Sequence, residues 1–227
     1  MEHYVIYRFF AADNEKIEVR LDFDAITFEL LPVTGQPTPD WARLDHHPCR
    51  DCACPTDVIY CPTALALARF IGSFDTRFSY EKAVVEIETP QRVILSKGSF
   101  QSGMASLLAV VCATSGCPAT RFLRPQVRFL IPFSDGREAL FRTVSTYLLC
   151  LHMNAAEKEP VQRRYLDEVA ARYVLLRQVT ANLVVRLRPV LRRHAALNAD
   201  ILLDAFSEIA AVDFDEGLAE LRMFCGD

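Results

Sequence analysis

Half of the cysteines in this sequence lie close together. Of the eight cysteines, four stand within 13 positions, at Cys49, Cys52, Cys54 and Cys61. The first two form a Cys-x-x-Cys turn, which lets two thiolates converge on one tetrahedral ion, and Cys61 can supply a third ligand if the intervening loop doubles back. The spacing therefore predicts a Cys-rich metal loop over residues 46–62, with zinc as the usual occupant.

The fourth ligand has several candidates. We favour Cys117, which follows a glycine turn at an expected helix start, because unpaired backbone N–H groups and the helix dipole there favour a thiolate. This choice would also tie the loop to the second half of the fold. Cys54 is nearer, but it shares a short, stiff segment with Cys52. His46 or His47 could bind instead through an imidazole nitrogen.

Other interpretations of the cysteines stay open. Three clustered cysteines with a distant Cys-Pro, here Cys117-Pro118, are also compatible with an iron–sulfur cluster. A third possibility is that the thiols bind no metal. Catalysis has less support, because His152, expected to be packed on an apolar stripe, and His194, in a polar stretch, show no spacing typical of a dyad with Cys117. The sequence contains no phosphate loop, dinucleotide fingerprint or zinc-protease motif. The remaining cysteines are interpreted as small core residues: Cys112, Cys150 and Cys225.

The composition is that of a packed globular protein, with 51% hydrophobic and 24% charged residues. A chain of 227 residues buries enough surface to fold without a metal, so any metal has a local role. The formal net charge of −4 argues against nonspecific nucleic-acid binding, which depends on neutralising several phosphates. The first residues lack a secretory pattern and no apolar run is long enough for a membrane span. We therefore expect a cytoplasmic protein with unpaired thiols and a possible protein partner.

The N-terminal half shows strand patterns around the cysteine segment. Strict polar–apolar alternation over residues 16–24 predicts a half-buried antiparallel strand. The β-branched and aromatic run 4–10 predicts its hairpin partner. The other elements expected in this half are a third strand at 26–30, a short helix at 62–74, and a second hairpin from 83–89 and 92–96.

Helical periodicity dominates the chain from residue 101 onward. A capping-box spacing at Asp135 predicts a helix start. Apolar residues then recur at three- and four-residue steps over 166–190, the spacing of a bundle seam that Pro189 should kink or end. We expect this seam to be buried mainly within the chain, together with a final pair of helices near 199–211 and 215–224.

Several motifs resemble an uncharacterised bacterial protein family. They are the runs 101–108, 113–118 and 131–133, with Cys49-x-x-Cys52 and Cys61-Pro62-x-Ala64. The resemblance spans most of the chain and implies no activity, because the family has no established reaction or cofactor. It adds weight to one ligand set over Cys54, namely Cys49, Cys52, Cys61 and Cys117.

Together these patterns predict an α+β protein. An N-terminal antiparallel β unit with the Cys-rich metal loop occupies residues 1–134, and a predominantly helical region, 135–227, packs on it as one globular unit. The expected function is that of a non-catalytic cytoplasmic binding or regulatory protein with structural zinc. The alternative is a thiol- or iron–sulfur-dependent redox enzyme.

Overall fold

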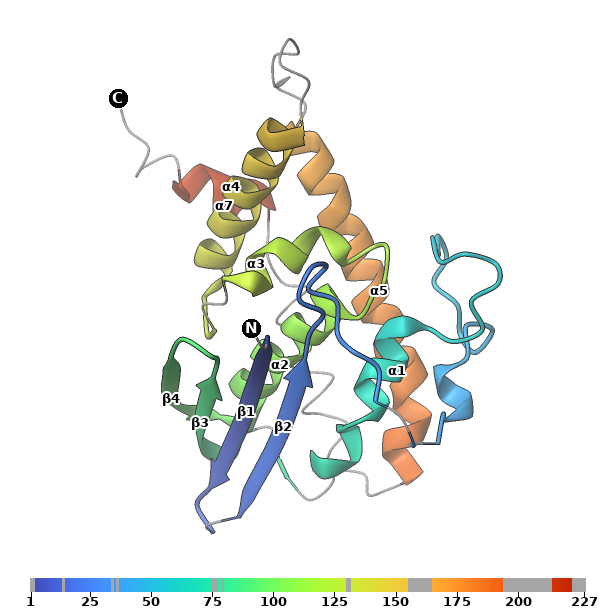
Figure 1. Ribbon diagram of the computed structural model, residues 1–227, viewed down its shortest axis with the longest axis vertical. Helices are drawn as coiled ribbons and strands as arrows, with labels where there is room; N and C mark the ends of the chain where they lie inside the picture. Colours follow the sequence, from blue (N-terminus) through green and yellow to red (C-terminus); the bar gives the residue numbers. More distant parts are fainter. Residues whose placement is uncertain are drawn as a thin grey trace.

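One antiparallel sheet forms the N-terminal half of the fold. The computed structural model describes residues 3–13, 15–33, 35, 37–74, 77–78, 80–129, 132–154, 165–193 and 214–221. Four strands pair in the order β2-β1-β3-β4 (Figure 1). Both expected hairpins are present, and β1 joins them by pairing with β3. The strands are β1 (Tyr4–Ala11), β2 (Lys16–Asp22), β3 (Lys82–Glu88) and β4 (Val93–Ser99).

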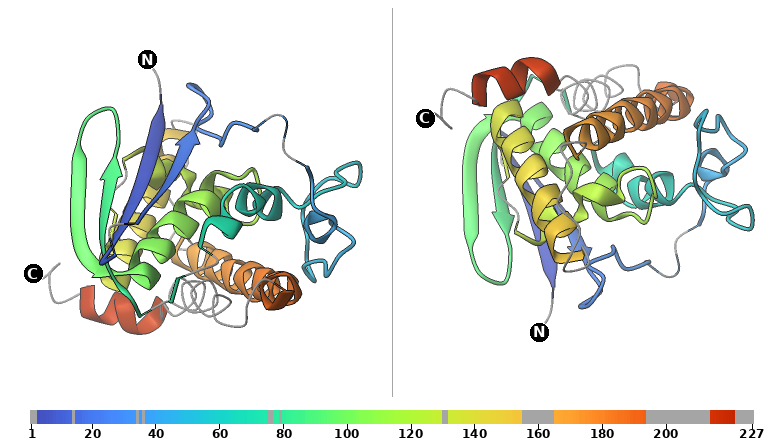
Figure 2. Two further views of the ribbon diagram at one scale, coloured as in Figure 1. Left: turned by 90° about the horizontal axis from the view of Figure 1, so that it is seen from below. Right: turned by 90° about the horizontal axis from the view of Figure 1, so that it is seen from above.

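Alternation along the strands gives the sheet one apolar face, and helix α2 (Phe100–Thr114) packs on it. At Gly103 the helix comes so close that a Cβ atom would lie 2.5 Å from Cε1 of Phe9 and 2.8 Å from Cγ2 of Val85. The opposite face carries Arg8, whose guanidinium binds two glutamates of β3 at 2.7 and 2.6 Å. The core therefore lies between the sheet and the helices (Figure 2).

The two ends of α2 place Cys117. At the start, the Ser99 hydroxyl accepts from the Ser102 N–H and the Ser102 hydroxyl accepts from the Ser99 N–H, which makes a capping box. After Thr114 the chain turns at Gly116, whose φ of +89° is readily adopted only by glycine. A helix was expected to start directly at Cys117, but residues 118–120 form a turn, followed by a 3-10 helix (Arg121–Leu123) and α3 (Arg124–Arg128).

Two further N-terminal expectations are wrong in detail. Residues 26–30 do not form a strand, because the Asp24 carboxylate accepts from the N–H groups of Ile26 and Thr27 and so fixes a turn. The helix that begins at Pro62 is shorter than expected. It is α1 (Pro62–Ala68), and a 3-10 helix (Ile71–Phe74) follows it.

The C-terminal half is mostly helical, as expected. It contains α4 (Gly136–Asn154), α5 (Tyr165–Arg193) and α7 (Phe214–Leu221), with Asp135 capping α4 through N–H groups of its first turn. The expected helix at 199–211 lies outside the described residues. Helix α5 runs past Pro189, so this proline does not end it. Pro189 lacks the N–H that would bond the carbonyl of Val185, a residue that is 44% exposed.

The apolar seam of α5 is buried within the chain, as predicted. Near its start, Val169, Tyr173 and Leu176 pack with Leu140 of α4. Further along, Val179, Leu183 and Leu187 belong to the core that includes the sheet and α2. One helix thus joins both halves, and its second part reaches the Cys-rich loop (Figure 1).

Candidate metal centre

The Cys-rich segment is a loop whose two ends are tied together. The Leu44 N–H donates to the carbonyl of Ile59 at 2.8 Å, and the Cys61 N–H donates to the carbonyl of Ala42, also at 2.8 Å. Within the loop, the Cys52 N–H donates to the Cys49 carbonyl at 3.3 Å, which is the tight turn expected of Cys-x-x-Cys. These bonds return Cys61 to the base of the loop, directly before α1.

The cysteines of this loop and Cys117 gather at one place. A cavity of about 20 Å³ is lined by Cys49, Cys52, Cys54 and Cys117, and α5 residues including Val179 form its other side. The predicted pairing of the loop with Cys117 is thus present in space, although 56 positions separate Cys61 from Cys117. Cys61 does not line the cavity, but its thiol lies near enough to interact electrostatically with those of Cys49 and Cys117.

The two alternative histidines do not line the cavity. His46 and His47 pack edge to face, with ring centroids 4.8 Å apart. Burial, then the neighbouring charges of His47 and Arg186, lowers the pKa of His46. The imidazole of His46 is therefore biased toward the neutral form that a metal ligand requires. Because His46 does not line the cavity, we favour the cysteine thiols as metal ligands.

Helix α5 holds the loop through two polar side chains that the sequence analysis did not single out. Arg186 is only 2% exposed, and its guanidinium donates to the carbonyls of Trp41 at 2.9 Å, His47 at 3.0 Å and Arg43. One turn earlier, Asn182 Nδ2 donates to the Pro48 carbonyl at 2.9 Å. The only sequence indication was that Arg186 stands beside the apolar stripe, three residues after Leu183.

Arg186 is a buried cation without a carboxylate partner among the described residues. The cations in the ion pairs between described residues are other arginines and one lysine, Lys16. Three carbonyl oxygens accept hydrogen bonds from its guanidinium but carry no net charge, and a buried charge is costly without an opposite one. Arg186 acts electrostatically on the thiols of Cys49 and Cys61, which would supply negative charge as thiolates. It also acts on His46, where the carboxylates of Asp40 and Asp45 act as well.

Burial favours the neutral form of three of these thiols, those of Cys49, Cys54 and Cys61. Desolvation is the largest cause that raises the pKa of Cys49 and Cys61, and it raises that of Cys54 to about 12. Opposing effects are already in place, because Asn182 hydrogen-bonds Cys49 and the Ala64 N–H hydrogen-bonds Cys61, and both lower the pKa. Thiolates here would therefore need a strong additional positive charge, which a metal ion supplies.

Within the described part of the chain, no three His, Cys, Asp or Glu side chains are grouped tightly enough to hold a metal ion as they stand. The structure thus brings the predicted cysteines to one place without placing them at ligand distances. Cys52 and Cys117 lie near enough to Cys49 to act electrostatically on its thiol.

The remaining predicted residues have mixed outcomes. Cys112 is buried in α2, as expected of a core cysteine, and Cys150 on α4 is half-buried. Cys225 and His194 lie outside the described residues. His152 was expected to be packed, but it is exposed near the end of α4, where no described structure covers it. None of the described helices is both long and apolar enough to cross a membrane.

Comparison with known proteins gives a family and no activity. The family model DUF6901, described as a domain of unknown function, matches residues 5–225. This match confirms the expected relation to an uncharacterised family. No curated protein and no solved structure matches the chain.

Proposed function

This chain belongs to the DUF6901 family, a domain of unknown function, and we propose that it is a non-catalytic, cytoplasmic binding or regulatory protein whose Cys-rich loop is held by a structural zinc ion. The observation that carries the proposal is that Cys49, Cys52, Cys54 and Cys117 line one cavity, near enough to the buried cation Arg186 for it to act electrostatically on Cys49. The absence of disulfides among the seven described cysteines suits a reducing compartment.

Charge balance favours a metal–thiolate centre at this place. Four thiolates on one zinc ion carry a net charge of about −2, which would offset the buried guanidinium of Arg186. In the same way, the guanidinium and the N–H groups directed at Cys49 and Cys61 favour the deprotonated sulfurs. The metal and Arg186 would therefore stabilise one another, and both would fix the loop to α5.

We propose Cys49, Cys52, Cys61 and Cys117 as the ligands. Cys61 is 9% exposed and its sulfur already accepts a hydrogen bond from the Ala64 N–H, as a ligating thiolate does. Cys54 is the rival fourth ligand because it lines the cavity, whereas Cys61 does not. A site closed by four sulfurs leaves no open coordination position for substrate, which is typical of structural zinc.

Metal analysis of cysteine variants tests this proposal. Protein purified without chelator should contain about one zinc per chain, and Cys49→Ser and Cys52→Ser should each lose it. Cys150→Ser on α4 is the matched control and should keep its zinc. If Cys54→Ser loses its zinc while Cys61→Ser keeps it, Cys54 is a ligand in place of Cys61. Zinc-free wild-type protein that also fails to bind added zinc would overturn the proposal.

A thiol- or iron–sulfur-dependent redox enzyme is the second candidate. It is favoured by the hydrogen bond between the Cys54 and Cys52 side chains and by the exposure of Cys52. Against it, the resolved pKa shifts of the described cysteines are upward, whereas a reactive thiol needs a lowered pKa. Colour separates the candidates, because an iron–sulfur protein is brown and a zinc protein is colourless.

A further inference from the structure

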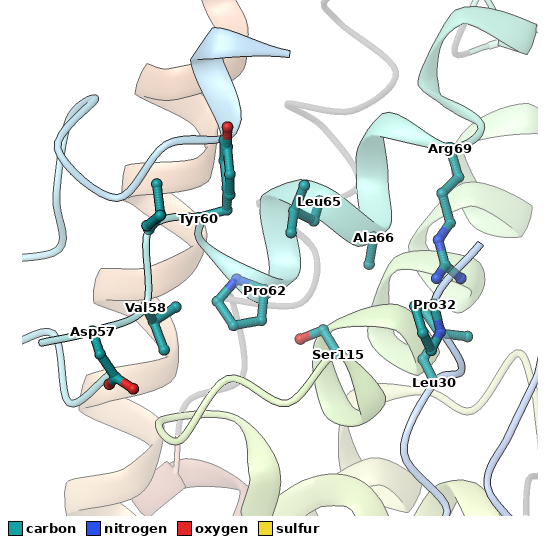
Figure 3. A pocket seen from close by; sticks show the side chains of 11 residues that line it. Leu30, Pro32, Asp57, Val58, Tyr60, Pro62, Leu65, Ala66, Arg69 and Ser115 are labelled. Atoms are coloured by element: carbon teal, nitrogen blue, oxygen red, sulfur yellow. The ribbon is translucent and has the colours of Figure 1, made fainter. Parts of the chain in front are cut away.

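A second, larger cavity lies beside the Cys-rich loop, between that loop, α1 and the end of α2 (Figure 3). Its volume is about 420 Å³, within the usual range of small-ligand pockets. Most of the lining is apolar, and one of the lining residues, Ile59, is 59% exposed. The apolar residues are Leu30, Pro32, Val58, Ile59, Tyr60, Pro62, Leu65 and Ala66.

One cation stands in this lining. Arg69, which follows α1, is half-buried and donates through Nη2 to the Leu31 carbonyl. It takes part in none of the ion pairs formed between described residues. The acid that acts on it electrostatically, Asp22, is itself bound by Arg20 at 2.8 Å. Burial lowers the pKa of Arg69, so its charge is incompletely compensated.

The polar groups give the pocket a direction. Asp57 stands at one end and Arg69 at the other, with apolar side chains between them (Figure 3). In the middle, the Ser115 hydroxyl is already bonded to Thr63 Oγ1 at 2.9 Å and to the Cys112 carbonyl at 3.3 Å. An anion is therefore attracted to the Arg69 end and repelled from the Asp57 end.

We propose that this pocket binds a small apolar monocarboxylic acid, with the carboxylate on Arg69 and the hydrocarbon along Leu65 and Val58. A guanidinium recognises a carboxylate through parallel N–H bonds, and the Arg69 atoms not bonded to Leu31 remain available as donors. The apolar wall contributes the remaining affinity by removing hydrocarbon from water. None of the proposed metal ligands lines this pocket, so binding of the acid and binding of zinc are tested separately.

The test uses 4-phenylbutyrate and its neutral analogue 4-phenylbutyramide on the full chain, followed by calorimetry and by NMR of the backbone amides. The acid should bind saturably and shift the amides of Leu30, Leu65 and Ser115. The amide should bind at least about tenfold more weakly, because it lacks the charge-assisted bond. Equal binding of acid and amide, shifts confined to another surface, or no saturable binding of the acid would each overturn the proposal.

Variants extend the test. Arg69→Met should weaken binding of the acid about tenfold or more, and Arg69→Lys should weaken it less because the charge remains. Arg92→Gln, at an exposed arginine in the β3–β4 turn, is the matched control and should bind as the wild type does. If Arg69→Met unfolds, the comparison of acid with amide on the wild-type chain still decides the question.

Discussion

Replacing Arg186 with methionine should loosen the Cys-rich loop and lower the stability of the whole protein. Methionine is of similar length and keeps most of the apolar packing while removing the guanidinium. Three carbonyls, those of Trp41, Arg43 and His47, would lose a charged donor. Each such bond contributes about 1.5 kcal/mol at the low end, and the exposed positions of Arg43 and His47 let water replace part of it. We expect a loss of about 2–4 kcal/mol in the free energy of unfolding.

Urea denaturation at a fixed excess of zinc measures this loss. A change of 2–4 kcal/mol corresponds to a fall of about 1–2 M in the urea midpoint. Arg188→Met is the control, because Arg188 is exposed on the same helix and its removal should change stability by less than about 0.5 kcal/mol. Of these two variants, only Arg186→Met should bind zinc more weakly than the wild type. Equal stability and equal zinc affinity in the two variants would refute the role given to Arg186.

Three further perturbations test the fold. Gly103→Ala should lower the unfolding free energy by about 1–3 kcal/mol in chemical denaturation, because its Cβ would meet the Phe9 ring at 2.5 Å; an unchanged midpoint would contradict this packing. Leu176→Ala with Leu183→Ala should cost about 2–5 kcal/mol each before non-additivity; a variant of full stability whose dimer dissociates in sedimentation would instead make the seam an oligomer interface. Hydrogen bonds from the turn lower the pKa of Asp24, so the ionised carboxylate stabilises the fold fully above its unfolded-state pKa, and this stabilisation is lost as the pH falls through its folded-state pKa. Asp24→Ala should therefore make the free energy of unfolding less dependent on pH in the acid range. An unchanged dependence of stability on pH would contradict the role given to Asp24.

Residue periodicity predicted the large elements, because burial acts on every second or every third to fourth residue. The alternation of β2 and the seam of α5 are examples, since each repeats over many positions. The prediction of a strand at residues 26–30 was wrong because of local hydrogen bonds to a polar side chain. At residues 26–30 the strand propensity of Ile26 and Phe28 is overridden by the Asp24 carboxylate, which binds the backbone of the turn.

Of the residues at the candidate site, only the cysteines could be predicted from the sequence. The spacing of Cys49 and Cys52 indicated the turn, and the glycine before Cys117 indicated a bend that could bring it near. Arg186 could not be assigned from sequence, because its partners are backbone carbonyls, and a carbonyl is the same in every residue type. The pairing of a helix with a loop more than 130 residues away is a property of the tertiary fold.

Zinc K-edge X-ray absorption on protein purified without chelator tests the central claim most directly, because it counts the atoms bound to the metal. Ligation by Cys49, Cys52, Cys61 and Cys117 predicts four sulfur neighbours at about 2.3 Å. A first shell dominated by nitrogen or oxygen at about 2.0–2.2 Å would contradict a four-thiolate centre, and a single nitrogen among three sulfurs would move one ligand to His46 or His47.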